Sequence, residues 1–109
     1  MTIKKLKKMP YAQAQVRIYT DINGEIYKTI LQSYGTDVIM IDKNGYVFVS
    51  GLYSSTTSRH ISAFCDEYLP TLDYYTIKDM WLHNKGYNKN KKQIILEFEQ
   101  PNGYRGYKF

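Results

Sequence analysis

The sequence of 109 residues has a single cysteine, Cys65, and therefore cannot form an intramolecular disulfide bond. Its two histidines, His60 and His83, are too few to supply the three or four converging ligands of a metal site. The seven glycines are scattered and form no glycine-rich phosphate loop. No apolar run approaches the length needed to cross a bilayer. We therefore expect no metal, no cofactor and no membrane partner.

The start of the chain, Met1 to Lys8, is basic but is not followed by the apolar segment of a signal peptide. This pattern predicts a cytoplasmic protein, either in its own cell or in an infected bacterial host. A chain of this length can bury one core without metals or disulfides. We expect a single domain over residues 1–109, made of a basic N-terminal arm (1–10), a folded core (11–100) and a basic aromatic tail (101–109).

The net charge of +5 is unevenly distributed along the chain. Residues 1–20 carry five basic and no acidic groups, residues 21–79 carry four basic and eight acidic groups, and residues 80–109 carry six basic and two acidic groups. Clustered charge attracts ligands of the opposite sign over long distances, which favours an anionic partner at the two ends. The alternative is that these lysines only keep a small protein soluble.

Two Asn-Gly pairs, Asn23-Gly24 and Asn44-Gly45, are the strongest short-range hairpin signals in the chain. Alternation of apolar and polar residues predicts half-buried strands on both sides of the first pair. The apolar run Val38 to Ile41 and the segment Tyr46 to Ser50 flank the second pair. A further alternating segment, Gln93 to Gln100, predicts a fifth strand.

Between these strands, apolar residues recur at the helical spacing i, i+3, i+4 and i+7, namely Ile61, Phe64, Cys65 and Tyr68. They predict a helix over residues 56–69, ended by Pro70. The segment Thr76 to Asp79 resembles a capping box and predicts a second, short helix. The predicted fold is therefore α+β, an antiparallel β-meander of four to five strands with one main helix and a second short helix on one face.

Five consecutive hydroxyl residues, Ser54 to Ser58, stand where the main helix begins. In a structural interpretation, one of them caps the helix by accepting an unpaired backbone N–H bond. In a functional interpretation, the helix N-terminus and Arg59 hold a phosphate or a carboxylate, unless Arg59 pairs with an internal carboxylate. The candidate partner-binding or anion-binding residues are Tyr53, Thr56, Thr57, Ser58, Arg59 and His60.

Two motifs, Ser-Tyr-x-Thr-x-Val at residues 33–38 and Tyr-Ser-x-Thr-Thr-Ser-Arg-His at residues 53–60, support a resemblance. With them the chain resembles small proteins carried by phages and mobile elements of low-GC Gram-positive bacteria. Among such proteins it is most similar to the type II-A anti-CRISPR proteins, which inhibit Cas9. The resemblance covers about residues 33–65. It implies Cas9, or Cas9 with its guide RNA, as the partner.

We expect the protein to bind without catalysis. A serine nucleophile needs a base within hydrogen-bond reach, and Ser58 and His60 point in different directions on a helix. The basic ends can instead contact nucleic acid, because Lys and Arg neutralise phosphates and exposed Tyr stacks on unpaired bases. The candidate nucleic-acid contacts are Lys4, Lys5, Lys7, Lys8, Lys89, Lys91, Lys92, Tyr104, Arg105, Tyr107 and Lys108.

Two functional hypotheses follow. The first is a phage-encoded anti-CRISPR protein that binds Cas9 stoichiometrically and prevents DNA binding or cleavage. Its basic net charge argues against imitation of DNA over its whole surface, and only the acidic segment 21–79 would suit a lysine-lined channel. The second is a small nucleic-acid-binding protein of a phage or plasmid. Tyr and Arg are enriched at protein interfaces as well, so a tyrosine-rich surface fits either class.

Overall fold

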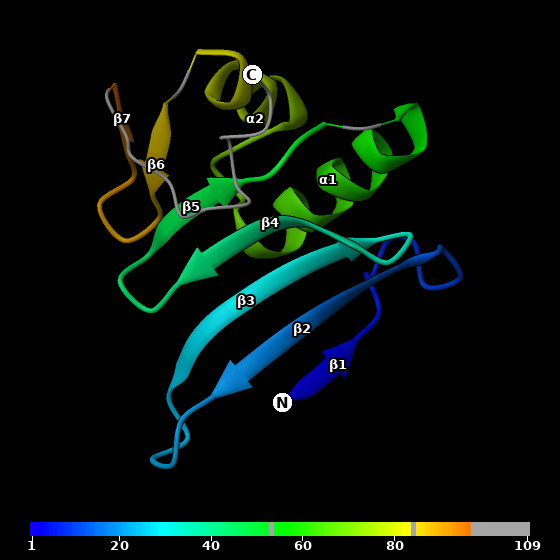
Figure 1. Ribbon diagram of the computed structural model, residues 1–109, viewed down its shortest axis with the longest axis vertical. Helices are drawn as coiled ribbons and strands as arrows, with labels where there is room; N and C mark the ends of the chain where they lie inside the picture. The colour runs from blue at the N-terminus through cyan, green and yellow to red at the C-terminus, as the bar shows by residue number, and fades with distance from the viewer. Residues whose placement is uncertain (53, 84, 97–109) are drawn as a thin grey trace.

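The computed structural model describes residues 1–52, 54–83 and 85–96. These residues form one antiparallel sheet in which the strands lie side by side in chain order (Figure 1). The strands are β1 (Thr2–Lys4), β2 (Ala14–Thr20), β3 (Ile26–Ser33), β4 (Thr36–Asp42), β5 (Tyr46–Val49), β6 (Gly86–Asn88) and β7 (Gln93–Ile95). Each strand pairs antiparallel with the one before it in the chain, through a two-residue turn between β3 and β4 and through a long helical segment between β5 and β6.

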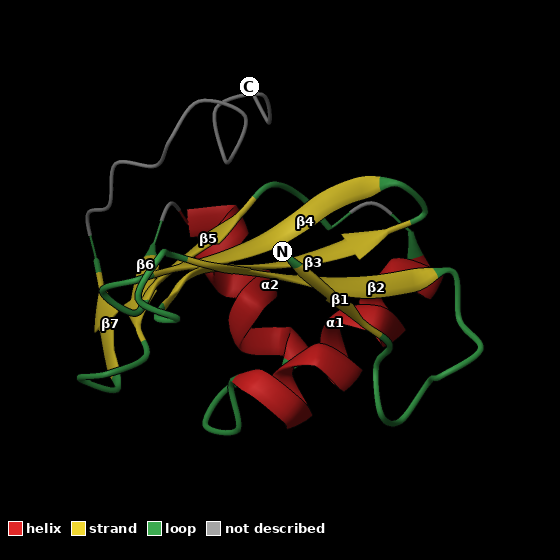
Figure 2. Ribbon diagram, turned by 90° about the horizontal axis from the view of Figure 1, so that it is seen from below, coloured by secondary structure: helices red, strands yellow, loops and turns green. Residues whose placement is uncertain are grey.

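Two helices, α1 (Ser55–Tyr68) and α2 (Tyr74–His83), lie between β5 and β6 in the chain. Figure 2 shows α1 against one face of the sheet, with α2 beside it. The alternation in β2 explains this contact, because Ala14, Val16 and Ile18 are buried on the face turned toward α1. They pack in a single core cluster with residues of both helices, including Ile61, Phe64, Ile77 and Met80.

The α+β prediction is confirmed, but the predicted number of four to five strands is wrong. The sheet of the described residues has seven strands. The two additional strands, β1 and β6, have three residues each and are too short to show an alternating pattern. They form by pairing with longer strands, with Ile3 opposite Arg17 and Tyr87 opposite Val47. Beyond residue 96, the predicted fifth strand lies outside the described residues.

Both Asn-Gly turns are present, with positive φ angles of 83° at Gly24 and 90° at Gly45. Each turn is stabilised by an aspartate, Asp21 directly after β2 and Asp42 at the end of β4. The carboxylates of Asp21 and Asp42 each accept backbone N–H bonds from the residues two and four positions later, at 2.8–3.0 Å. The two hairpins are therefore specified by local sequence.

The start of α2 differs from the prediction. The capping box at Thr76 would begin the helix there, but α2 already begins at Tyr74. Asp73 Oδ1 accepts two hydrogen bonds from Thr76, one from the backbone N–H at 2.8 Å and one from the hydroxyl at 2.9 Å. Asp73 therefore serves as the N-cap, and these hydrogen bonds lower the pKa of its carboxyl group.

The N-terminal segment contributes to the fold. Residues 2–4 form the edge strand β1, and Leu6 is fully buried in the core cluster. The following basic residues contact α1, because Lys8 Nζ lies 2.7 Å from Asp66 Oδ2 and the Lys7 backbone N–H donates to Glu67 Oε1 at 3.0 Å. In the structure the segment expected as a basic arm is thus part of the sheet and the core.

Candidate functional site

The two motifs, about twenty residues apart in sequence, meet where the β3–β4 turn lies over the first half of α1. Ser33, the last residue of β3, contacts two residues of α1. Its Oγ lies 3.0 Å from Thr57 Oγ1 and 2.8 Å from His60 Nδ1. All three residues are at most 3% exposed. We call Ser33, Thr57 and His60 the buried motif cluster.

The buried motif cluster satisfies polar groups that would otherwise be costly to bury. Burial lowers the pKa of His60, because removal from water disfavours the charged imidazolium. The Ser33–His60 contact has the reach of a nucleophile and its base, but both side chains are closed off from solvent. Cys65 is likewise buried, and burial raises the pKa of its thiol to about 12, so it is not an activated nucleophile.

The hydroxyl segment begins α1 through a single cap. Ser54 is the N-cap, and its Oγ accepts the backbone N–H bond of Thr57 at 3.2 Å. Ser58 Oγ donates to the Ser55 carbonyl oxygen one turn earlier, at 2.5 Å. For Ser54 and Thr57 the structural interpretation of the hydroxyl segment therefore applies, because one caps the helix and the other donates the capped N–H group.

Exposed residues of the same motifs flank the buried cluster. Tyr34 is 57% exposed and its ring lies 5.5 Å from that of His60. Arg59 is exposed on α1, and no carboxylate within the described residues pairs with it. Thr56 and Ser58 are half-buried. We call Tyr34, Thr56, Ser58 and Arg59 the exposed motif surface.

The predicted anion-binding residues are thus divided by the fold. Thr57 and His60 are turned into the interior and cannot reach a partner, so their assignment as contacts is corrected. They face inward because a helix that packs on a sheet buries one stripe, and the positions of Thr57, His60, Ile61 and Phe64 form that stripe. Arg59, Thr56 and Ser58 remain accessible, whereas Tyr53 lies outside the described residues.

The predicted nucleic-acid contacts do not form one surface in the described part of the chain. Lys4 and Lys5 lie at the β1 edge of the sheet, and Lys8 pairs with Asp66. The other basic group, Lys89, Lys91 and Lys92, is exposed at the β6–β7 turn. Strand order places β1 and β7 at opposite edges (Figure 1). The remaining predicted contacts, Tyr104, Arg105, Tyr107 and Lys108, lie outside the described residues.

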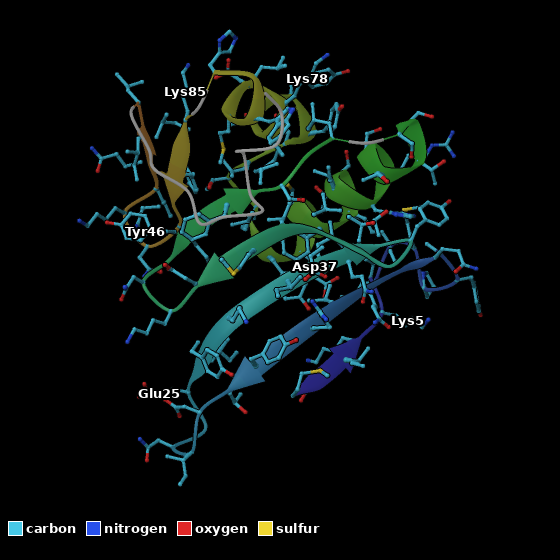
Figure 3. The ribbon with its side chains drawn as sticks, viewed as in Figure 1. Lys5, Glu25, Asp37, Tyr46, Lys78 and Lys85 are labelled. Atoms are coloured by element: carbon cyan, nitrogen blue, oxygen red, sulfur yellow. The ribbon has the colours of Figure 1, made fainter. Side chains whose placement is uncertain are left out.

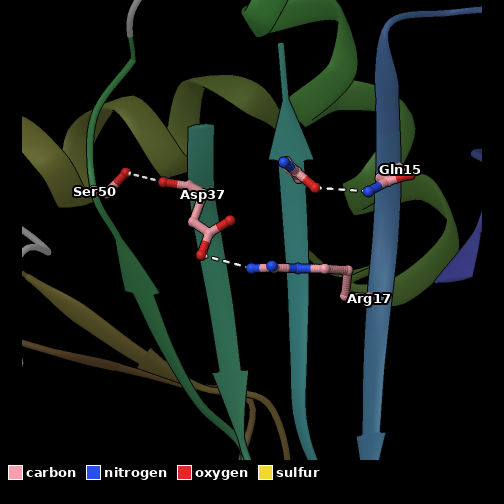
Figure 4. Close-up of polar contacts among 5 residues, drawn as sticks. Gln15, Arg17, Asp37 and Ser50 are labelled. Carbon is pink, nitrogen blue, oxygen red and sulfur yellow. Dashed lines mark hydrogen bonds and ion pairs between the residues drawn. The ribbon is translucent and has the colours of Figure 1, made fainter. Parts of the chain in front are cut away.

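A feature that the sequence analysis did not identify lies on the sheet face turned away from α1, which we call the outer face. There Gln15 Nε2 donates to Gln32 Oε1 at 2.7 Å, and Arg17 Nη2 lies 2.6 Å from Asp37 Oδ2 on β4 (Figure 4). Ser50 Oγ also donates to the Asp37 carbonyl oxygen, at 2.5 Å. The sequence alone did not indicate these pairs, because the partner of a strand residue depends on strand register.

A cavity of about 300 Å³ opens beside this polar group. Figure 3 places Lys5 next to the start of β2, at the end of the sheet opposite to Glu25. The cavity is lined by Lys5, Ala12, Gln13, Ala14, Gln15, Gln32, Tyr34 and Gly35. Tyr34 therefore belongs both to the exposed motif surface and to the cavity wall, which makes this end of the sheet the candidate functional site.

Fold and site together define a small α+β domain with a helix-backed antiparallel meander and a polar site at one end of its sheet. The chain belongs to a family of unknown function (DUF8033), whose family model matches residues 2–97. No curated protein and no solved structure matches it. Neither helix of the described residues is long and apolar enough to cross a membrane, and no metal-binding group of His, Cys, Asp and Glu side chains occurs among those residues.

Proposed function

We propose that the protein acts by stoichiometric binding and that its partner is Cas9 or the Cas9–guide RNA complex, so that DNA binding or cleavage is prevented. The resemblance of the two motifs to type II-A anti-CRISPR proteins supports the choice of partner. The observation that carries the proposal is the position of Arg59 on the exposed motif surface, next to the buried motif cluster.

The geometry favours binding because the same motifs supply both an anchor and a contact surface. Ser33, Thr57 and His60 join α1 to the end of β3 through buried hydrogen bonds. A side chain carried by such a fixed segment loses little backbone freedom when it binds a partner. Arg and Tyr, here Arg59 and Tyr34, are the residue types that most often dominate the binding energy of protein interfaces.

The test is a cleavage assay with purified Cas9–guide RNA complex and increasing amounts of the protein. We expect cleavage of target DNA to stop at about one protein per nuclease. Arg59→Ala should raise the concentration needed by about tenfold, as expected for loss of an interface arginine. Lys78→Ala is the matched control, because Lys78 is also an exposed cation on a helix and lies on α2 (Figure 3).

Each part of the proposal has an outcome that contradicts it. Inhibition by trace amounts, or a chemically modified nuclease or guide RNA after the reaction, would show catalysis. No effect on Cas9 at any ratio would exclude Cas9 as the partner. A lower melting temperature of Arg59→Ala would show that Arg59 stabilises the fold and would remove it from the contact surface.

A small nucleic-acid-binding protein is the second candidate. The observation that favours it is the group of exposed lysines on the β6–β7 turn, Lys89, Lys91 and Lys92. Binding dominated by phosphate contacts weakens steeply as salt concentration rises, whereas a protein–protein complex is less sensitive. Titration of the protein with single-stranded DNA and RNA at increasing salt concentration separates the two candidates.

A further inference from the structure

We propose that the cavity lined by Lys5, Gln15, Gln32 and Tyr34 binds one unpaired nucleotide. In this assignment the ring of Tyr34 stacks on the base, the two glutamine amides hydrogen-bond its edge, and Lys5 contacts the phosphate. The proposal rests on the second functional candidate and deepens it by naming the residues that would hold the nucleic acid.

Tyr34 is held in a conformation that its own chemistry disfavours. Tyr34 and Gly35 form the β3–β4 turn with φ angles of 51° and 82°, as in the type I′ turn of tight hairpins. A bulky residue with positive φ is rare, and Asn or Gly usually fills this position. Tyr34 is nevertheless 57% exposed, so core packing does not explain its presence. Strained residues of this kind occur preferentially at functional sites.

Both the backbone and the ring of Tyr34 make contacts that would support a stacking platform. The Tyr34 backbone N–H donates to the Gln13 carbonyl oxygen at 2.9 Å, and the ring rests 5.5 Å from that of His60. Aromatic side chains stack on unpaired bases irrespective of sequence, because every base has a π-face. The cavity beside the ring, about 300 Å³, is within the usual range for small-ligand sites.

The pair of glutamines supplies the groups that recognise a base edge. Because Gln15 Nε2 donates to Gln32 Oε1, the other polar atom of each amide remains for a ligand, Gln15 Oε1 as an acceptor and Gln32 Nε2 as a donor. Within the described residues no hydrogen-bond partner takes either of these atoms. The Watson–Crick edge of every base carries a donor next to an acceptor, and this edge is free only in an unpaired nucleotide. The amide pair therefore favours single strands over duplexes.

Charge at the mouth of the cavity agrees with this ligand. Lys5 is exposed, lines the cavity and has no carboxylate partner among the described residues. A lysine in this position neutralises a phosphate attached to the bound nucleoside. The nearby Arg17 is already paired with Asp37, so Lys5 is the cation left for the phosphate.

The test measures fluorescence anisotropy of labelled ten-nucleotide single strands, the matching duplex and the same strand with central abasic residues. We expect wild-type protein to prefer the intact single strand. Tyr34→Asn should weaken binding by about tenfold or more through loss of stacking. Its melting temperature should hold or rise, because Asn-Gly is the favoured sequence of a type I′ turn. This combination separates a binding role from a structural one.

Two further variants test the other parts of the cavity. The double variant Gln15→Leu with Gln32→Leu should remove the preference for intact over abasic strands. Lys5→Ala should reduce the slope of log K against log salt by about 0.7, the value for one phosphate of a single strand. Lys78→Ala, which changes an exposed lysine on α2, is the matched control and should leave that slope unchanged.

The outcomes distinguish this proposal from the candidate function on which it rests. If salt-sensitive binding persists in Tyr34→Asn and in the glutamine variant, the cavity is not the binding site, but the protein still binds nucleic acid. No binding of any strand would overturn both, and equal affinity for duplex would overturn the unpaired nucleotide. Competition by free mononucleotides at micromolar concentration would mean that the cavity binds a free nucleotide. Binding that resists such competition would mean that its ligand is a nucleotide within a single strand.

Discussion

His60 occupies a buried position that favours the neutral form of its side chain. The side chain is 1% exposed and its Nδ1 atom contacts Ser33 Oγ at 2.8 Å. A buried imidazole cannot gain a proton without losing the solvation of the charged form, and this cost lowers its pKa. From the sequence alone, His60 was grouped with Arg59 as a contact residue. The structure gives the two neighbours different positions, because His60 is buried and Arg59 is exposed.

The lowered pKa of His60 predicts that stability decreases on acidification. The pKa of a histidine in the unfolded chain is near its ordinary value of 6.5, and the folded state binds this proton only at lower pH. Between these two values the unfolded state binds more protons, so the free energy of unfolding rises with pH and falls as pH drops below 6.5. Urea denaturation at pH 7.5 and 5.5 should show this loss. A His60→Gln variant with the same pH dependence as wild type would contradict the assignment.

Each helix is preceded by an N-cap residue whose side chain accepts a hydrogen bond from the backbone N–H three positions later. In α1 this residue is Ser54, and in α2 it is Asp73. The second start was predicted too late because Thr76 and Asp79 match a capping box as well, and local sequence does not rank the two alternatives. For α1, five consecutive residues carry a hydroxyl group, so the sequence did not show which of them caps the helix. Both choices became clear only from the hydrogen bonds.

The adjacent serines at the start of α1 provide a matched comparison. Ser54→Ala should lower the free energy of unfolding by about 1 kcal/mol, because the N–H group of Thr57 loses its acceptor. Ser55→Ala should change it by less than about 0.5 kcal/mol, since the Ser58 hydroxyl bonds only the backbone carbonyl of residue 55. Chemical denaturation of both variants checks this prediction. Equal losses would mean that the cap is shared among the hydroxyls.

The N-terminal segment contributes strand β1 to the sheet and Leu6 to the core. Leu6 is fully buried in the same cluster as Val16 on β2 and Phe64 on α1. The basic side chains around it hid this contact, because a single apolar residue among lysines shows no period. Across the whole molecule, the chain order of the strands also places the two lysine-rich segments at opposite edges. The two lysine-rich segments of the sequence therefore do not form one continuous basic surface.

Leu6→Ala tests the role of the N-terminal segment. Removal of a fully buried leucine side chain should cost about 2–5 kcal/mol, through lost burial and the cavity left behind. Lys4→Ala, an exposed position in β1, should cost less than about 0.5 kcal/mol. The measurement is chemical denaturation followed by circular dichroism. A loss below about 1 kcal/mol for Leu6→Ala would mean that the segment is a detachable arm, as its composition suggested.

Local sequence determined the features that depend on near neighbours. The Asn-Gly pairs predicted both hairpins, because few residues tolerate the positive φ angles of such turns. Apolar spacing predicted α1 and its buried face, since a helix brings residues three and four apart to one side. The buried Cys65 and Phe64 followed from the same pattern.

Tertiary structure decided every feature that depends on partners distant in the chain. The three-residue strands β1 and β6 exist because longer strands pair with them. Ser33 meets His60, and Gln15 meets Gln32, only after strand register and helix packing have placed them. Whether Arg59 or His60 faces solvent was fixed by the side of α1 that packs on the sheet. Periodicity reports local geometry, whereas contacts across 17 or 27 residues depend on how the whole chain closes around its core.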